Sequence, residues 1–579
     1  MPKAKAGAKR QGRKRAAAKA APVPVAAGLS AADGGARTSR GEWIFLGALV
    51  AAAFVFRLLM ALRDHDVLWD GYYYGVLGKN LIRGNFSEGM STYWSPLYPL
   101  LVGVSSLFFS DLKFAASFVS VVAGTLTVAA VYFLIRDLYG RAEAGVGAAL
   151  TAAYPQLVLY SAVFLTEATY TLLFVCGMHA GWLALSRRGG RHFLLAGLAF
   201  GACYLVKPEA FAYAGLLTFV AAASAFVARR LLTKETLLNV ALVAVGFLVL
   251  AAPYVLYLRA QTGRWTLSEK TAMHLHGAVN IYKLTPDGEG TLADRLWVGG
   301  RRGESAAGGR RGGSESFARP PAGGQTPSLA ARLTTNLPKE SRTLLKVVPA
   351  PLLALALLGL AAPPWSRARA AREGYILLFL LSTLAGYAVT TSVNEARLLT
   401  PLVPAFACWW ARAVVIIEAW IARGYSALRG AGEPAARRRA ALRAVLVAAL
   451  CLALVPWSVS VLGRGARSGY GREGVGRWLA ANSAGGPLMA AAPWPAFYSG
   501  GEHLFLPLEP YPTVIEYARR KGVSFIVIEE DTTSPHMRFL FQPGGEERAA
   551  ADLAPAYRYD YEGKPGHRIV VYKLTAASP

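Results

Sequence analysis

A carboxylate lies in an aromatic stretch that follows the first long apolar run of the chain. The stretch reads "VLWDGYYYGVLGKNLIRGNF" over residues 67–86 and places Asp70 next to three tyrosines and among several glycines. A carboxylate can act as a general base, but an aspartate here also suits the N-cap of a helix over "GYYYGVLGKNLI". Tyr72 and Tyr74 could provide flat surfaces for a ligand, although amphipathic aromatic residues also gather at membrane surfaces. The glycines would let the backbone approach a ligand closely.

Two cations lie at the ends of later apolar runs. Lys207 in "LVKPEAF" and Arg397 in "NEARLLTP" each stand as a lone cation at a helix end. Either could bind a phosphate, because charge-assisted hydrogen bonds to phosphate are strong. Lysine and arginine near helix ends also snorkel to the membrane surface, and Arg397 could instead pair with Glu395.

Further acidic and histidine residues leave several functions open. Glu167 and Glu209 lie at the ends of apolar runs, where substrate contact, metal binding and an ion pair with the lysine of "LVKPEAF" all fit. His274 and His276 alternate in a loop and could bind a divalent cation together with Glu88 or Glu167. Solvated loop histidines are the simpler interpretation. A divalent metal is therefore possible, and no cofactor is certain.

The composition is typical of a membrane protein, so these residues must act in or beside a bilayer. Hydrophobic residues make up 54% of the 579 positions and the mean hydropathy is +0.34, with repeated apolar runs of about twenty residues, enough to cross a bilayer. The net charge of +27 resides in the N-terminal tail and short loops, without a nucleic-acid reader motif. All four cysteines lie within apolar runs, as packing residues do. We predict a polytopic α-helical membrane protein that contacts membrane lipids and no nucleic acid.

About eleven transmembrane helices are expected. They cover residues 43–62, 114–135, 144–159, 168–185, 193–206, 210–227, 237–258, 345–362, 375–391, 398–421 and 444–462. A further run at 96–109 is short and begins "SPLYP". The basic loops all fall on the side of the basic N-terminus only if this run does not cross, so we predict a juxtamembrane or re-entrant helix.

The tendency of basic loops to stay in the cytoplasm also predicts how the domains are arranged across a plasma or bacterial inner membrane. Residues 1–42 form a disordered basic cytoplasmic tail, and residues 43–462 form the transmembrane domain with external loops 63–113 and 259–343. The Gly-, Arg- and Ser-rich insert 299–327 is expected to be disordered. Residues 463–579 have the composition of an external soluble α/β domain, with helices at "GVGRWLAANSA" and "TVIEYARRKG" and strands at "VSFIVIEE" and "HRIVVYKL".

Several motifs in this order resemble a known family. They are "WDGYYYGVLGKNLIRGNF" followed by "YWSPLYPLLVG", then "TEATY", "LVKPEAF", "TGRWTLSEKTAMHL" and "NEARLLTPLVPAFA". The chain resembles membrane glycosyltransferases of the C-type superfamily, in the branch of the protein O-mannosyltransferases and the lipid A aminoarabinose transferase (glycosyltransferase family 39-like). Many relatives have an Asp-Glu pair in the first loop, whereas Gly71 follows Asp70 here, so the role of a second carboxylate is absent or supplied elsewhere.

The resemblance implies transfer of a hexosyl or pentosyl group from a polyprenyl-phosphate donor to a hydroxyl of a lipid, glycan or protein acceptor, with inversion at the anomeric carbon. It assigns Asp70 as the general base. Lys207 and Arg397 are then candidates for holding the donor phosphate, with Glu167, Glu209, Glu88, Tyr72 and Tyr74 in supporting roles. A polytopic transporter or lipid-linked sugar flippase is the alternative, and a non-catalytic scaffold a weaker one. The sequence shows neither the internal repeat nor the mid-span charge typical of transporters.

Overall fold

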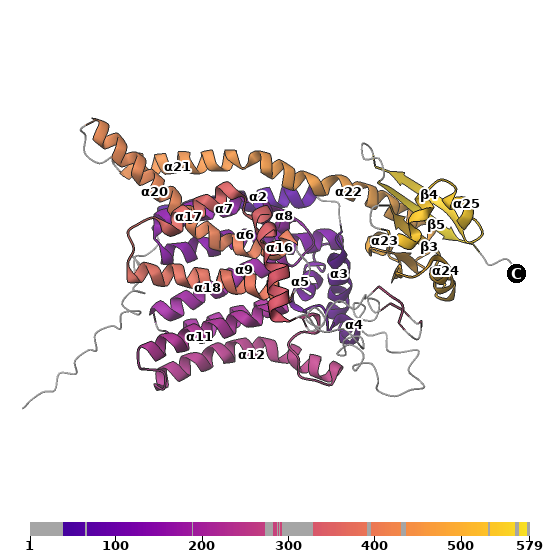
Figure 1. Cartoon of the computed structure of the whole chain (residues 1–579), viewed down its shortest axis with the longest axis horizontal. Helices are drawn as coiled ribbons and strands as arrows, with labels where there is room; N and C mark the ends of the chain where they lie inside the picture. Colours follow the sequence, from indigo (N-terminus) through magenta and orange to yellow (C-terminus); the bar gives the residue numbers. More distant parts are fainter. Residues whose placement is uncertain are drawn as a thin grey trace, which may run out of the picture.

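The computed structural model of the protein describes residues 39–63, 67–187, 189–271, 282–285, 288, 290–291, 328–390, 395–429, 436–530, 533–561 and 567–575. Long helices lie side by side in one bundle, and a small sheet domain stands beyond one end of it (Figure 1). Within these residues, seven helices are long and apolar enough to cross a membrane, or up to nine if each of two bent helix pairs counts as one span. The expected polytopic membrane protein is confirmed.

The candidate spans follow the predicted apolar runs. Seven of them are α2 (Arg40–Arg63), α6 (Leu112–Leu138), α9 (Glu167–Arg187), η1 with α11 (Pro208–Ala210 and Phe211–Val227), α12 (Lys234–Thr262), α18 (Arg367–Thr390) and α19, η2 and α20 together (Ala396–Leu399, Thr400–Leu402 and Val403–Arg429). The bent pairs are α16 with α17 (Leu329–Val347 and Ala350–Ala361) and α21 with the start of α22 (Ala436–Ala453 and Val455–Asn482). The two other expected spans coincide with shorter helices, α7 with α8 (Arg141–Ala153 and Pro155–Ala162) and α10 (Gly190–Tyr204).

The break between α7 and α8 shows how the bundle satisfies its polar backbone groups. Pro155 opens α8, and a proline has no N–H to continue the hydrogen-bond ladder of α7. The buried guanidinium of Arg57 donates to the carbonyl oxygens of Thr151 and Ala152 at 3.3 and 3.1 Å. A cation at the carboxyl end of a helix also complements the helix dipole. The break therefore leaves these carbonyls satisfied in an apolar bundle.

Three short helices lie between the first two spans. They are α3 (Trp69–Ile82), α4 (Phe86–Gly89) and α5 (Leu97–Ser105). The nine residues of α5 extend about 14 Å, well short of the roughly 30 Å hydrocarbon core. This helix cannot cross alone, as predicted for 96–109. In Figure 1, α3 and α16 run across the direction of the spans, near the end of the bundle that faces the sheet, and α16 is bent by 94° from α17.

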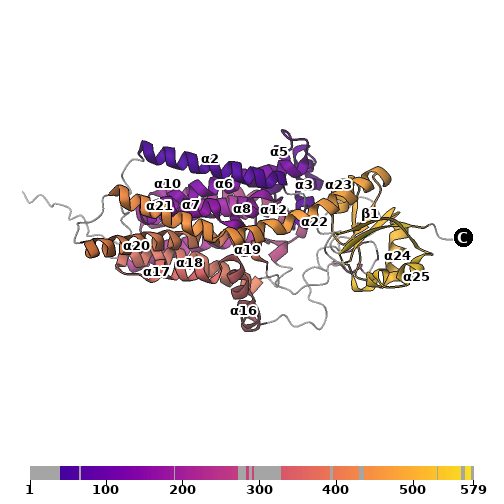
Figure 2. The same ribbon diagram turned by 90° about the horizontal axis from the view of Figure 1, so that it is seen from above.

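The C-terminal domain is the expected α/β unit. Its sheet has the order β2-β1-β3-β5-β4, with β1 parallel to β2 and β3, and β5 antiparallel to β3 and β4. The strands are β1 (Leu488–Ala490), β2 (His503–Phe505), β3 (Phe525–Glu529), β4 (Leu553–Asp560) and β5 (Arg568–Leu574), and the helices are α23 (Trp494–Ser499), α24 (Tyr511–Arg520), η3 (Pro535–Phe541) and α25 (Gly545–Ala549). Helix α22 runs from the bundle to this sheet (Figure 2), so the expected boundary at residue 463 falls within a helix.

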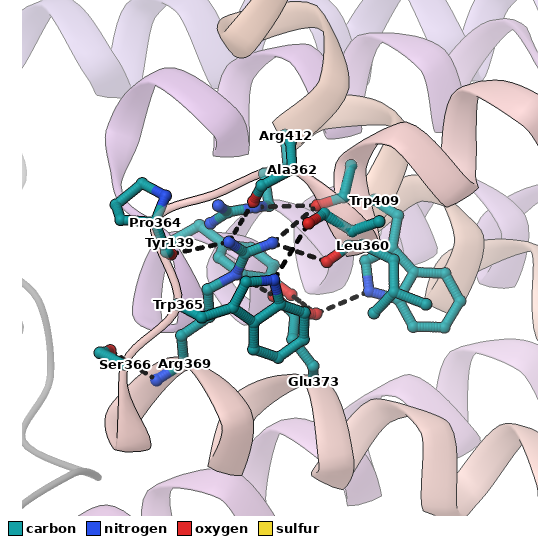
Figure 3. Close-up of polar contacts among 12 residues, drawn as sticks. Tyr139, Leu360, Ala362, Pro364, Trp365, Ser366, Arg369, Glu373, Trp409 and Arg412 are labelled. Atoms are coloured by element: carbon teal, nitrogen blue, oxygen red, sulfur yellow. Dashed lines mark hydrogen bonds and ion pairs between the residues drawn. The ribbon is translucent and has the colours of Figure 1, made fainter.

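A buried polar cluster around Arg369 and Glu373 joins several helices of the bundle (Figure 3). Arg369 in α18 donates to carbonyl oxygens at the end of α17, including that of Leu360 at 2.6 Å, and pairs with Glu373 at 3.4 Å. The other carboxylate oxygen of Glu373 accepts from Tyr139, the residue that follows α6, and from Trp409 in α20, each at 2.7 Å. The cluster therefore connects α6, α17, α18 and α20 with buried hydrogen bonds.

We predict that Arg369→Ala destabilises the bundle. Glu373 is 1% exposed and would remain buried without its cation, which costs about 3–5 kcal/mol. Thermal unfolding of the purified protein in detergent should show a clearly lower midpoint. Arg367→Ala, at an exposed position of the same helix, should change stability by less than about 0.5 kcal/mol. Equal shifts in the two variants would contradict the structural role of the cluster.

Candidate active site

Glycines hold α3, the helix that carries Asp70, tightly against its neighbours. A Cβ atom added at Gly78 would lie 2.4 Å from the carbonyl oxygen of Pro99 in α5, closer than any real contact. A Cβ at Gly71, next to the aspartate, would lie 3.0 Å from the carbonyl oxygen of Phe164. These glycines approach protein backbone instead of open space. The sequence predicts a close approach of backbone to a ligand at the glycines of this stretch, and the close approach seen at Gly71 and Gly78 is to protein backbone.

Asp70 lies in the first turn of α3, and its carboxylate contacts Arg397, a residue that comes much later in the sequence. Its Oδ2 accepts a hydrogen bond from Nη1 of Arg397 at 2.7 Å, across 327 positions. The N-cap position of α3 is Leu68, so Asp70 is not the cap that the sequence allowed. Arg397 also pairs with Glu395, the alternative that the sequence left open. Neither the base candidate nor its cation is isolated.

The charges around Asp70 keep it ionised. Burial alone would raise the pKa of Asp70, but Arg397, Lys270 and Lys207 together outweigh burial and bring the pKa below its ordinary value. The side chains of Asp70 and Arg397 remain 19% and 24% exposed. The carboxylate is therefore anionic at neutral pH, and part of its surface remains exposed.

Lys207 forms a second, more deeply buried ion pair. Its Nζ donates to Oε1 of Glu167 at 3.0 Å and lies 5.4 Å from the ring centre of Tyr170. Glu167 is 1% exposed, and its Oε2 has no hydrogen-bond partner among the described residues. Glu167 also lines a small cavity together with Tyr160, Ser161, Thr171 and Thr400. Of the roles left open for Glu167, the structure contains the ion pair with Lys207.

Lys270 is a site residue that the sequence interpretation missed. Its Nζ lies 5.2 Å from the ring centre of Tyr93 and 5.0 Å from that of Trp94, as in cation–π contacts. Its charge also lowers the pKa of Asp70, so it belongs to the same cluster. The signal in the sequence is its position inside the stretch "TGRWTLSEKTAMHL", one of the motifs that carry the family resemblance.

The three tyrosines of the opening stretch do not share one environment. Tyr74 is buried, with edge contacts to Trp94 and Tyr98, and burial raises its pKa well above the ordinary value. Tyr73 is also buried and stacks on Trp94. Tyr72 is half-buried and makes edge contacts with other rings. Tyr72 is thus better placed than Tyr74 to meet a ligand.

The remaining candidates are more peripheral. Glu209 accepts from the hydroxyl of Tyr387 at 3.1 Å, so it is Glu167 and not Glu209 that pairs with the lysine between them. Glu88 is exposed on α4. His274 and His276 lie outside the described residues. Among the residues that are described, no group of three or more His, Cys, Asp or Glu side chains is arranged to hold a metal ion.

The arrangement combines an ionised carboxylate with three cations at one end of a membrane bundle. A carboxylate with exposed surface can accept a proton from a hydroxyl, and lysine and arginine can bind a phosphate. All three cations act electrostatically on the same carboxylate, so the carboxylate and the cations form one cluster. Such a site suits a reaction between a hydroxyl and a phosphorylated molecule anchored in lipid.

Residues 94–266 match the family described as dolichyl-phosphate-mannose-protein mannosyltransferase. The fold is similar to that of ArnT from Cupriavidus metallidurans bound to undecaprenyl phosphate, with a TM-score of 0.58 at 14% sequence identity over 93% of this chain and 100% of that chain. The apo crystal structure of the same ArnT gives a TM-score of 0.57 at 13% identity, over 94% and 100%. Archaeal AglB from Archaeoglobus fulgidus, in complex with an inhibitory peptide and a dolichol-phosphate, is more distant, with a TM-score of 0.48 at 13% identity over 93% and 77%.

No curated protein sequence matches the chain significantly. The family match and the shared ArnT fold nevertheless agree with the motifs quoted above. They confirm the resemblance to C-type membrane glycosyltransferases and support a membrane glycosyltransferase.

We predict that the pair of Glu167 and Lys207 is needed for stability only as a pair. Lys207→Met would leave a buried unpaired carboxylate and should cost about 3–5 kcal/mol. Adding Glu167→Gln should restore most of this loss, because no unpaired charge remains. Thermal midpoints of the wild type, both single variants and the double variant measure the coupling.

Lys79→Met, at an exposed position of α3, is the matched control for loss of a lysine. If Lys79→Met lowered the thermal midpoint as much as Lys207→Met does, the buried ion pair would not be a particular source of stability.

Proposed function

We propose that the protein transfers a sugar from a polyprenyl-phosphate donor to an acceptor hydroxyl at the external membrane face, with inversion at the anomeric carbon. The observation that carries this proposal is the ionised Asp70, partly exposed and surrounded by Arg397, Lys207 and Lys270 at the end of the bundle. A general base and a phosphate-binding set are the two functions that the reaction requires. Both occur in one cluster.

The donor phosphate is proposed to bind Arg397 and Lys207, with Lys270 as a third cation. A guanidinium has five N–H donors, so Arg397 can hold a phosphate while it still contacts a carboxylate. A phosphate bound to Arg397 shares its positive charge and so weakens the ion pair that lowers the pKa of Asp70. Asp70 then becomes a stronger base when the donor is bound. Donor binding and proton abstraction are coupled through one arginine.

The comparisons support a lipid-phosphate donor of this kind. The ArnT with the shared fold was crystallised with undecaprenyl phosphate, and the matching family is described by dolichyl-phosphate-mannose. The transferred group in this chain is proposed to be a hexose or a pentose, and the acceptor a lipid, a glycan or a protein. A divalent metal would need residues outside the described part of the chain, such as His274 and His276, as ligands.

The proposed orientation places the N-terminus in the cytoplasm and the C-terminal domain outside, in a plasma or bacterial inner membrane. The support comes from the basic loops, which would all lie on the cytoplasmic side. The site and the sheet domain lie toward the same end of the bundle (Figure 1). Residues 463–579 would then form an external domain close to the site of transfer.

We predict that Asp70→Asn removes transfer and leaves the fold intact. Asparagine is nearly isosteric but cannot take up the proton, so the rate should fall about 10²- to 10⁴-fold. The measurement is the mass added to an acceptor in membranes that contain the protein and a polyprenyl-phosphate sugar.

Glu235→Gln, an amide substitution at an exposed carboxylate of α12, is the matched control and should keep its rate. Full transfer by Asp70→Asn would rule out the general-base role. Movement of the intact lipid-linked sugar without any transfer would favour a flippase.

We also predict weaker donor use in the double variant Glu167→Gln with Lys207→Met. This variant has no unpaired buried charge, so its kinetics report the lost phosphate contact instead of misfolding. The loss should be about 1.5–3 kcal/mol for one charged hydrogen bond, or roughly 10- to 150-fold in kcat/KM for the donor. Unchanged donor kinetics, equal to those of Lys79→Met, would show that Lys207 serves structure alone.

A further inference from the structure

The C-terminal domain touches the helix that carries the proposed base. The hydroxyl of Tyr73 in α3 lies 3.2 Å from Nδ1 of His503 in β2. The ring of Phe505, at the end of the same strand, stacks on Tyr73 with centres 6.3 Å apart and contacts Trp69 at 6.0 Å. These residues come from two domains and lie about 430 positions apart. Helix α3 is therefore held from the sheet side as well as from the bundle.

The chemistry of His503 defines the direction of this hydrogen bond. Its Nε2 lies 3.1 Å from the carbonyl oxygen of Ala490 in β1, which can only accept, so Nε2 carries the proton. Burial lowers the pKa of His503 to about 3, which keeps the ring neutral at physiological pH. Nδ1 is then an acceptor, and the hydroxyl of Tyr73 donates to it. The backbone of the sheet thus fixes the ring that receives Tyr73.

The contact lies close to the proposed base along the helix. Tyr73 follows Asp70 by three residues, so the two side chains project from neighbouring positions on one side of α3. Asp70 meets Arg397 from the bundle at 2.7 Å, and Tyr73 meets His503 from the sheet at 3.2 Å. The first turn of α3 is held between two partners from distant parts of the chain.

A second external segment is fixed by the same domain. The backbone N–H of Leu508 donates to the carbonyl oxygen of Tyr282 at 2.9 Å, and the Tyr282 ring contacts both Trp69 and Phe505. Trp69, the residue before Asp70, therefore lies between the loop and β2. The sheet domain therefore contacts Trp69 and Tyr73, the residues that flank Asp70 on the first turn of α3.

We propose that Tyr73 and His503 are positioning residues through which the C-terminal domain orients Asp70 for catalysis. The inference rests on the proposed transferase function. The domain fixes the first turn of α3, and with it the direction of the carboxylate toward the acceptor. A shift of the reacting groups by about 1 Å can cost about 10²-fold in rate, so one hydrogen bond at this turn has a large effect on turnover.

The test compares two substitutions that each remove one buried tyrosine hydroxyl. Tyr73→Phe keeps the ring stacking and loses the bond to His503. Tyr98→Phe is the matched control, because its hydroxyl bonds within the bundle to Ser120 at 3.2 Å and not to the sheet domain. We expect Tyr73→Phe to lower kcat on the order of ten- to hundred-fold with donor KM within about twofold, and Tyr98→Phe to keep kcat.

Substitutions at His503 test whether a side chain that keeps the hydrogen bond to Tyr73 also keeps the rate. His503→Gln can still donate to the Ala490 carbonyl and accept from Tyr73, so it should keep most of the rate. His503→Leu should lose as much as Tyr73→Phe, and the combination of the two should lose little more, because both remove the same bond.

Hydrogen exchange of the α3 amides is the readout that does not depend on activity. Exchange in α3 should rise in Tyr73→Phe and His503→Leu and stay at the wild-type level in His503→Gln and Tyr98→Phe. The inference is overturned if Tyr73→Phe matches Tyr98→Phe in kcat, or if α3 exchange is unchanged. If the wild type showed no transfer, the proposed function would be disproved. Hydrogen exchange in α3 would still test the positioning contact by itself, because unchanged exchange in Tyr73→Phe and His503→Leu would disprove it.

Discussion

The ion pair between Asp70 and Arg397 is the interaction on which the site depends. It joins a short helix after the first span to the turn before α20, and no local sequence pattern could bring these residues together. Each charge alone would be costly at the edge of an apolar bundle, whereas the pair keeps Asp70 ionised despite burial. Lys207 and Glu167 form a second ion pair that is more deeply buried. The bundle can therefore hold these charged side chains because each one pairs with an opposite charge.

The same requirement explains much of the membrane fold. Arg57 bonds the carbonyls freed where α7 ends, and Arg369 bonds those at the end of α17. In both cases a buried arginine satisfies backbone groups that lipid cannot. Gly78 and Gly71 serve a different constraint, since they let α3 lie in backbone contact with α5 and with Phe164. Arg57 and Arg369 are thus buried cations that satisfy backbone carbonyls, whereas Asp70 keeps 19% of its side chain exposed and is the carboxylate proposed to act in the reaction.

The sequence predicted what depends on composition and short-range pattern. Apolar runs identified the spans, and the short stretches "VSFIVIEE" and "HRIVVYKL" identified β3 and β5 of the C-terminal domain. The sequence also indicates Asp70, Lys207 and Arg397 as candidates, but only as separate features, and it leaves their ion-pair partners open. Their partners depend on tertiary packing, which local patterns do not contain. His503 had no signal at all, because its role arises only where a strand 430 positions away meets Tyr73.

The pairing of a base with a phosphate-binding cation has a consequence for the proposed reaction. The acceptor oxygen forms a bond to the anomeric carbon as the bond between that carbon and the phosphate oxygen breaks. The phosphate oxygen keeps the electron pair, so negative charge grows on the lipid phosphate. At the same time the acceptor hydroxyl gives its proton to Asp70, which loses its charge. Arg397 then no longer faces an anion at Asp70, and its positive charge becomes available to the leaving phosphate at the step where stabilisation matters most. Proton abstraction and leaving-group stabilisation thereby reinforce each other through one guanidinium, while Lys270, held against the Tyr93 and Trp94 rings, adds a further cation to the same field.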